Sequence, residues 1–153
     1  MNKVHFTSIS DEWETPQDLF EKYNTIYHFQ LDAAATKENT KCKDFFTKED
    51  NALVQNWSKY QTVWLNPPYG RKIGFFIKKA YEESLKDVTI VCLIPARTDT
   101  KYFHDYCLKY GKVEFLRGRL RFINRLLPSY KKDGDFKSSP APFPSCIVIF
   151  GLK

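Results

Sequence analysis

The sequence predicts an α/β fold with a mainly parallel sheet and helices on both of its faces. Short apolar runs rich in β-branched and aromatic residues alternate along the chain with segments whose apolar residues have helical spacing. One of these runs, residues 88–94, is almost uniformly apolar, as is typical of a strand buried on both faces. The 153 residues, 42% of them hydrophobic, suffice for one core, so we expect residues 1–153 to form a single domain.

The first predicted element is a helix that begins after Thr15. Thr15 suits the N-cap, Pro16 suits the first turn, and Asp18 can reach back as in a capping box. The apolar face of this helix is supplied by Leu19, Phe20 and Tyr23.

Two strands are predicted before residue 70. Residues 29–33 read as a short strand that ends in a carboxylate followed by small residues. Residues 62–65 are β-branched and aromatic, and the prolines of the following segment, 66–70, forbid both ladder pairing and helix. Residues 37–51 are ambiguous between element types.

The remaining elements continue the alternation of helices and strands. They are a helix over residues 73–85, a strand over 88–94, a helix from Asp99 as its cap to Tyr110 that ends at Gly111, and strands over 112–116 and 146–150. The Pro-, Ser- and Gly-rich stretch 128–145 is a predicted long loop. Ligands bind beyond the carboxyl ends of the strands in such sheets, which is where Asp32 and Asn66 fall.

The composition excludes several classes of protein. Charged residues are 27% and apolar residues are not depleted, which argues against intrinsic disorder, and no apolar run approaches the roughly 20 residues of a bilayer span. The N-terminus lacks an apolar signal core, so we expect a cytoplasmic protein. The four cysteines form no C-x-x-C pair and are expected to be reduced, mostly buried thiols: Cys42, Cys92, Cys107 and Cys146.

Basic residues are concentrated in the C-terminal part of the chain, although the net charge is only +6. Residues 101–153 contain 11 Lys and Arg against 4 Asp and Glu, whereas residues 1–60 contain 7 against 10. This asymmetry indicates that the C-terminal part holds a polyanion, because Lys and Arg bind phosphates by releasing counterions. A solvated surface is the alternative interpretation of the charge alone.

The segment Asn66-Pro67-Pro68-Tyr69 is the most specific signal in the sequence. An amide, two prolines and an aromatic ring directly after a buried strand form a rigid polar pocket suited to an aromatic amine. The Asn66 side-chain oxygen and the Pro67 carbonyl oxygen can accept the two amine hydrogens, while Tyr69 stacks on a base swung out of its helix. A proline-stiffened turn with a core tyrosine is the structural alternative.

At these residues the sequence resembles the amino-group DNA methyltransferases, specifically the small phage-associated family of DNA N-6-adenine methyltransferases. The resemblance implies a Rossmann-like S-adenosylmethionine-dependent methyltransferase fold with an antiparallel C-terminal strand. It also implies S-adenosylmethionine as methyl donor, adenine in DNA as acceptor and, for a phage protein, action in the host cytoplasm. The segments that carry it span nearly the whole chain: Trp13 to Pro16, Leu31 to Ala35, Asn39 to Phe46, Asp50 to Leu53 with Trp57, Trp64 to Tyr69, Ile94 to Thr100 with Phe103 and His104, and Gly118 to Phe122.

The resemblance further implies a set of donor-binding residues. Thr15 and the amides of the following helix start would meet the donor's carboxylate, Asp32 its ammonium, and Asp50 its adenine or ribose. Asp50 is alternatively a helix cap or a solvated acid. The wider superfamily prefers glycines where this chain has alanines. The complete candidate set is Trp13, Thr15, Pro16, Asp32, Ala33, Ala34, Asp50 and Asn66.

Residues that would contact DNA follow the later strands. The basic run around Phe122, which extends to Arg125, predicts phosphate contact, with a solvated strand face as its alternative. Arg97, Thr98 and Asp99 follow the strand over residues 88–94 and would line the channel for the base or the backbone. For Asp99, a role as a plain helix cap is an equal alternative. No metal is expected. The candidates are Tyr69, Arg71, Arg97, Thr98, Arg117, Arg119 and Arg121.

Two rival functions stay open at this point. The same pocket can accept the 4-amino group of cytosine, or it can accept adenine in RNA instead of DNA. The alanines of the donor loop also allow a basic DNA-binding protein that has lost catalysis.

Overall fold

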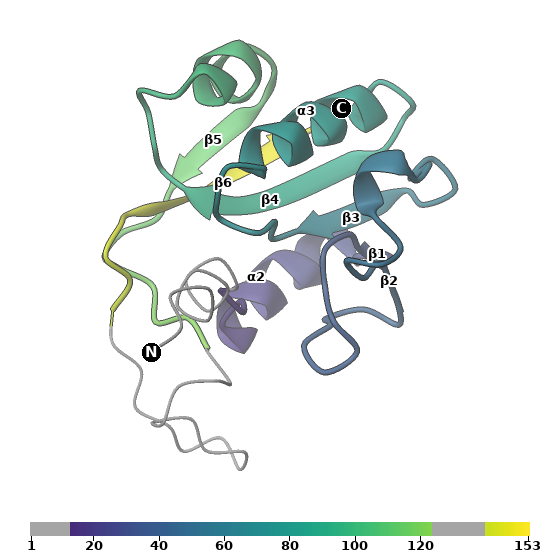
Figure 1. The fold of residues 1–153 in the computed structure, drawn as a ribbon, viewed down its shortest axis with the longest axis horizontal. Coiled ribbons are helices and arrows are strands. Elements are labelled where there is room, and N and C mark those ends of the chain that lie inside the picture. Colours follow the sequence, from purple (N-terminus) through teal and green to yellow (C-terminus); the bar gives the residue numbers. More distant parts are fainter. Residues whose placement is uncertain (1–12, 124–139) are drawn as a thin grey trace.

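Six strands form one sheet in the order β2-β1-β3-β4-β6-β5 (Figure 1). The computed structural model describes residues 13–123 and 140–153. All neighbouring strands are parallel except that β6 runs antiparallel to both β4 and β5, so the predicted mainly parallel sheet with an antiparallel C-terminal strand is confirmed. The strands are β1 (Leu31–Asp32), β2 (Asp44–Phe45), β3 (Thr62–Leu65), β4 (Thr89–Pro95), β5 (Lys112–Phe115) and β6 (Ser145–Phe150).

Helices cover both faces of this sheet, as predicted (Figure 1). α2 (Gln17–Tyr27) packs on one face, where the Phe20 ring meets the Trp64 ring edge to face at 5.4 Å. α3 (Ile73–Ser84) packs on the other face, where the rings of Tyr81 and Phe150 lie 6.4 Å apart. The short helical segments are η1 (Ala52–Val54) and η2 (Phe103–Leu108).

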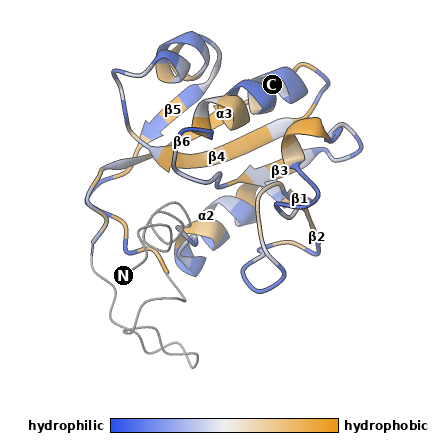
Figure 2. Ribbon diagram, in the orientation of Figure 1, coloured by the Kyte–Doolittle hydropathy of each residue, from blue (hydrophilic) through white to orange (hydrophobic). Residues whose placement is uncertain are grey.

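The core lies in the middle of the sheet, between the two helical layers. Residues 90–94 of β4 are fully buried, which explains why this strand is apolar on both faces (Figure 2). β3 contributes Val63, Trp64 and Leu65 to the same core. Cys92, Cys107 and Cys146 are buried free thiols, as expected, whereas Cys42 is half-buried.

The strand order reverses between β1 and β3. β2 lies on one side of β1, and β3, the next strand in the chain, lies on the other side of β1. Side chains beyond the carboxyl ends of β1 and β3 therefore line the switch point at which ligands bind in Rossmann-like sheets. Asp32 and Asn66 occupy these two strand ends.

The predicted cap of the first helix is wrong, although its apolar face is confirmed. Phe20 and Tyr23 are buried, but α2 starts at Gln17 without a side-chain hydrogen bond at its cap. Asp18 Oδ1 accepts from the adjacent Leu19 amide instead of reaching back. Thr15 is engaged by another side chain, as described below.

The helix predicted from Asp99 starts later than expected. Thr100 Oγ1 donates to the Arg97 carbonyl at 2.7 Å, which closes a turn before the helix, and Tyr102 precedes the π-helical segment η2. The helix ends before Gly111, as predicted. The position has no room for a side chain, because an added Cβ would lie 2.6 Å from Val148 Cγ1 and 2.9 Å from the Cys107 carbonyl oxygen.

Other boundaries differ by a few residues. The strand predicted over residues 29–33 is reduced to Leu31–Asp32, and the ambiguous stretch 37–51 contains β2 between turns. Most of the loop predicted over 128–145 lies outside the described residues, and β6 begins at its end. Within the described ranges, every helix is too short or too polar to cross a bilayer.

Candidate active site at the ends of β1 and β3

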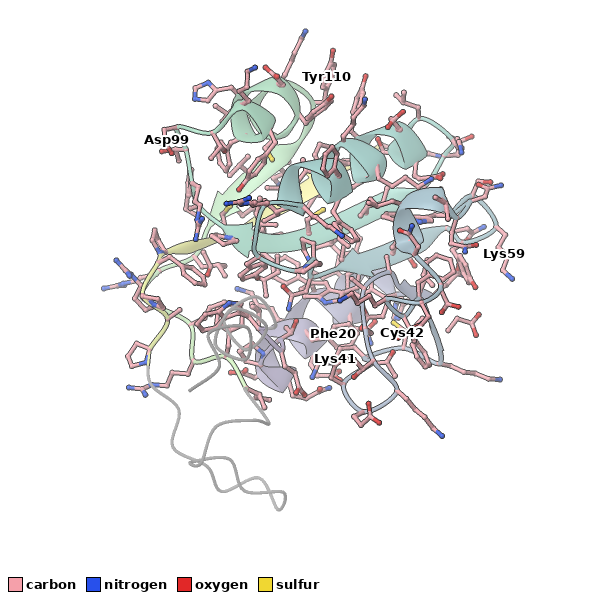
Figure 3. All side chains as sticks on the ribbon, viewed as in Figure 1. Phe20, Lys41, Cys42, Lys59, Asp99 and Tyr110 are labelled. Carbon is pink, nitrogen blue, oxygen red and sulfur yellow. The ribbon has the colours of Figure 1, made fainter. Side chains whose placement is uncertain are left out.

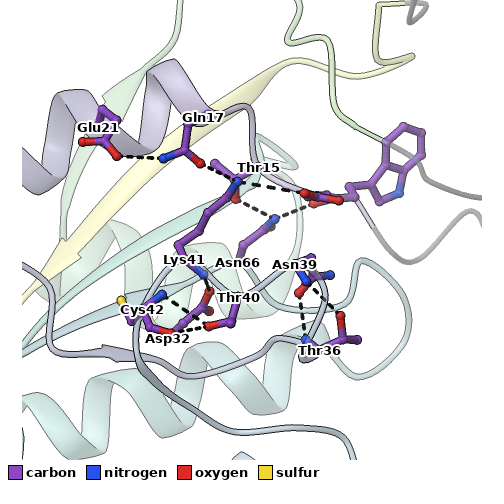
Figure 4. A network of polar contacts seen from close by, with 12 residues as sticks. Thr15, Gln17, Glu21, Asp32, Thr36, Asn39, Thr40, Lys41, Cys42 and Asn66 are labelled. Atoms are coloured by element: carbon purple, nitrogen blue, oxygen red, sulfur yellow. Dashed lines mark hydrogen bonds and ion pairs between the residues drawn. The ribbon is translucent and has the colours of Figure 1, made fainter. Parts of the chain in front are cut away.

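Asp32 and Asn66 come from neighbouring strands. Asp32 pairs with Trp64 in the parallel register of β1 and β3, and Asn66 follows two residues later. The Ala33 amide donates to the Trp64 carbonyl at 2.9 Å, which continues the ladder to the point where both side chains emerge. A polar network surrounds them (Figure 4).

The side-chain amide of Asn66 is held in one orientation by its two donor hydrogens. Nδ2 donates to the Trp13 carbonyl oxygen and to Thr15 Oγ1, the latter at 3.0 Å. Oδ1 is buried and has no hydrogen-bond partner among the described residues. Because a buried acceptor without a partner is costly, Oδ1 is a strong acceptor for a donor that enters the site.

Asp32 presents a second buried acceptor. The residue is 3% exposed. Its Oδ2 accepts from the Lys41 amide at 2.9 Å, whereas Oδ1 has no partner within the described ranges. Burial raises the pKa of this carboxyl from 3.8 to about 7, although the Lys41 and Ala34 amides and the Lys41 charge oppose the rise. A cationic group beside Oδ1 would favour the ionised form.

Lys41 joins this site although it was not among the candidate residues predicted from the sequence. Its ammonium nitrogen lies 2.9 Å from Gln17 Oε1 and 4.0 Å from Glu14 Oε1. The residue stands in a polar stretch of lysines and acids, where no local pattern separates a buried lysine from a solvated one. Only the pairing of β1 with β2 brings it against the segment before α2.

Of the remaining donor-binding candidates, some lie beside Asp32 and Asn66, whereas Asp50 is engaged in a local turn. Thr15 contacts Asn66, and Ala33 is fully buried at the end of β1. Pro16 precedes α2, and Ala34 is half-buried. Asp50 is exposed, and its Oδ2 accepts from the Thr47 amide at 2.8 Å and the Thr47 hydroxyl at 3.0 Å, so this carboxylate closes a local turn.

Tyr69 is buried in an aromatic cluster formed by Trp13, Tyr69, Phe122 and Phe143. The residue is 6% exposed, and its ring meets the Phe122 and Phe143 rings edge to face at 5.9 and 5.7 Å. Its hydroxyl donates to the Leu93 carbonyl at 3.1 Å, and burial raises the Tyr69 pKa well above its ordinary value. The Trp13 ring contacts the same two phenylalanines.

The arginine candidates are exposed and follow the carboxyl ends of three parallel strands. Arg71 comes after β3, Arg97 and Thr98 come after β4, and the run from Arg117 comes after β5. All of them therefore start from the sheet edge that carries Asp32 and Asn66. Figure 3 shows Asp99, on the loop after β4, on the outside of the molecule.

The basic run is braced by the chain that precedes β6. Arg119 Nη1 donates to the Ala141 carbonyl at 3.4 Å, and the Ala141 amide donates to the Leu120 carbonyl at 2.8 Å. Arg117, Arg119 and Arg121 are exposed whereas Phe122 is buried. Arg125, the fourth member of the predicted run, lies outside the described residues.

Comparison with known proteins gives a matching family and similar proteins that include two from phages. Residues 4–147 match the family described as DNA N-6-adenine-methyltransferase (Dam). The chain is 39% identical over 97 residues to a DNA N-6-adenine-methyltransferase of Escherichia phage T1, a match that covers 63% of this chain and 40% of that protein. It is 36% identical over 122 residues to the enzyme of the same name from Haemophilus phage HP1, covering 76% and 69% of the two chains.

Proposed function

Because the chain belongs to the DNA N-6-adenine-methyltransferase (Dam) family, we propose that it transfers a methyl group from S-adenosylmethionine to the 6-amino group of a flipped adenine in DNA. The matched part spans less than half the length of the phage T1 relative, so the activity is a proposal for this chain. We propose that residues 1–153 act as a single methyltransferase domain in the host cytoplasm.

One observation supports the proposal most directly, namely the unpaired Oδ1 of Asn66. An adenine amino group is a poor nucleophile because its lone pair is delocalised into the ring. An acceptor that takes one of its hydrogens favours a tetrahedral nitrogen, whose lone pair then points out of the ring plane. Since Trp13 and Thr15 occupy Nδ2, the amide presents its oxygen without reorganising, which is the condition for effective electrostatic catalysis.

The residues at the end of β1 fit the methyl donor. The unpaired Oδ1 of Asp32 is a buried acceptor suited to the ammonium of an amino acid, which would keep the carboxyl ionised, and Ala33 keeps the adjoining chain close to β3. When bound, S-adenosylmethionine supplies an electrophilic methyl group. Asp32 would orient the amino-acid end, and the fixed Asn66 would hold the acceptor amine. The amine proton can leave to water, so no histidine base is required.

Tyr69 is proposed to stack on the flipped adenine, with Pro67 and Pro68 keeping the turn rigid. In the described structure the ring packs against Phe122 and Phe143, so entry of a base would require these edge-to-face contacts to rearrange. The exposed arginines at the same sheet edge are proposed to contact the DNA backbone, through Arg71, Arg97, Arg117, Arg119 and Arg121, with Thr98 beside them.

The proposal is tested by incubating duplex DNA with isotopically labelled S-adenosylmethionine and the protein, followed by mass spectrometry of the nucleosides. We expect label in N6-methyladenine, and its loss with Asn66→Ala. Asn56→Ala is the matched control, because Asn56 is exposed and its side-chain oxygen accepts from the neighbouring Ser58. Label in N4-methylcytosine would show that cytosine, not adenine, is the acceptor. Binding of DNA without binding of S-adenosylmethionine would show that the protein is a non-catalytic DNA-binding protein.

A further inference from the structure

Two polar side chains reach residues 13–17: Asn66, which follows β3, and Lys41, which lies in the turn between β1 and β2 (Figure 4). Asn66 contacts this segment through the Trp13 carbonyl and the Thr15 hydroxyl. Lys41 contacts it through Glu14 and Gln17. The two anchors alternate along the segment, since Asn66 contacts residues 13 and 15 and Lys41 contacts residues 14 and 17, and the Glu14 backbone also pairs with Ile123.

The Lys41 contact is made by buried charges. The side chains of Lys41 and Glu14 are only 9% and 7% exposed. A buried ammonium group is stable only when acceptors compensate its lost hydration, and here the acceptors are Gln17 Oε1 and the Glu14 carboxylate. Removal of the ammonium group would leave the Glu14 carboxylate without this compensation and would remove the contact with Gln17, while the Glu14 backbone stays paired with Ile123.

The main chain of Lys41 is also engaged at the site, because its amide donates to Asp32 Oδ2. One residue therefore connects the donor end of the site, through its amide, with the segment that orients Asn66, through its ammonium group. We propose that Lys41 is a positioning residue that fixes the orientation of the Asn66 amide by holding residues 13–17. This inference rests on the proposed function, because it concerns the amide that would receive the acceptor amine.

The first test compares steady-state methylation by Lys41→Met and by Lys43→Met. Methionine keeps the length of the lysine stem and removes the charge, and Lys43 is an exposed lysine two residues away. We expect Lys41→Met to lower kcat at least tenfold with the KM for DNA within twofold of the parent, because the acceptor is misoriented while the DNA surface is intact. Lys43→Met should retain the parent kcat. An unchanged kcat in Lys41→Met would overturn the proposal.

A conservative variant and a double-mutant cycle separate positioning from general stability. Lys41→Arg keeps the charge and should recover part of the lost kcat. Thr15→Val removes the hydroxyl that accepts from Asn66, so its effect and that of Lys41→Met should be less than additive if both act on the same amide. Full additivity of the two losses would show that Lys41 acts elsewhere.

A third measurement does not depend on activity. The side-chain amide protons of Asn66, followed by NMR in the protein without ligands, should exchange at least tenfold faster in Lys41→Met than in the parent or in Lys43→Met. Gln17→Ala, which removes one exposed acceptor, gives a milder variant in case Lys41→Met does not fold, and should accelerate exchange several-fold. Unchanged exchange in the folded variants would refute the proposal. An inactive parent would instead count against the proposed function.

Discussion

Thr15 Oγ1 accepts a hydrogen bond from Asn66 Nδ2 at 3.0 Å, and this contact takes the place of the helix cap that the sequence predicts for Thr15. A threonine hydroxyl before a helix commonly satisfies a free backbone amide of the first turn. Here it constrains a side-chain amide 51 residues away in the sequence, at the carboxyl end of β3. The residues just before α2 thereby become part of the site.

Replacing Thr15 by Val should lower the methylation rate about 3- to 10-fold. Valine has nearly the same shape but cannot accept from Asn66, and one such hydrogen bond contributes about 1 kcal/mol. Thr15→Ser, which keeps the hydroxyl, should retain most of the activity. Single-turnover methylation rates would measure both variants. A Thr15→Val rate equal to the parent's would show that the contact does not orient the amide.

Asn66→Ala should lower the methylation rate by about 10²–10³-fold, the usual effect of losing a preorganised group that stabilises a transition state. Asn66→Asp should also be impaired, because a carboxylate oxygen would face the Trp13 carbonyl where Nδ2 now donates. Calorimetric titration of the donor should stay near the parent value for Asn66→Ala. Activity above half of the parent's in that variant would contradict the assigned role.

Tyr69→Phe should lower the free energy of unfolding by about 0.5–1.5 kcal/mol, because it leaves the Leu93 carbonyl without the hydroxyl of Tyr69. Tyr69→Ala should cost about 3–5 kcal/mol by opening a cavity in the aromatic cluster. Denaturant unfolding measures both changes. In binding to DNA, Tyr69→Phe should do little and Tyr69→Ala should lose about 1–3 kcal/mol of base stacking. Equal binding losses in the two variants would argue against stacking.

The Asp32 carboxyl should make stability fall as the pH rises from about 4 to 7. Burial raises the pKa in the folded protein to about 7, above the ordinary value of 3.8, so the folded state holds a proton that the unfolded state has lost. The full penalty is reached above the folded pKa and is absent below the unfolded one. Asp32→Asn should remove this dependence, which denaturant unfolding at several pH values would show as a difference from the parent. Parallel curves for the two proteins would contradict the assignment.

Loss of an arginine that contacts a phosphate should lower the slope of log affinity against log salt by about 0.9 on duplex DNA. Alanine variants of Arg71, Arg97, Arg117, Arg119 and Arg121 would be titrated with DNA at several salt concentrations. Lys59→Ala is a charge-matched control, because Lys59 is exposed on the loop before β3, at the opposite end of that strand. Unchanged slopes for all five variants would place DNA on another surface.

The sequence was sufficient for those parts of the fold that depend on periodicity. The positions of β3 and β4 follow directly from the composition of their apolar runs, and α3 follows from its helical spacing. The start of α2 and the length of β1 could not be predicted, because each depends on a partner distant in the sequence. Thr15 is engaged by Asn66, and β1 has partners on both sides only for two residues.

The site shows the same division. Asn66 and Asp32 were predictable, because polar residues after buried strands meet at a sheet's carboxyl edge. The burial of Lys41 was not, since nothing in its neighbours distinguishes it from Lys43. The aromatic cluster around Tyr69 was also hidden, because its members come from four separate segments of the chain.

The hydrogen bond between the Ala141 amide and the Leu120 carbonyl ties the chain that follows β5 to the chain that enters β6. The Phe122 and Phe143 rings, 6.0 Å apart, make a second contact between the same two segments. Because β6 pairs with β4 in the middle of the sheet, the exposed Arg117, Arg119 and Arg121 are fixed to the core through β6 as well as through β5. A basic surface mounted on two strands keeps its charges at a constant distance from the ends of β1 and β3, so a bound polyanion would meet a preformed surface.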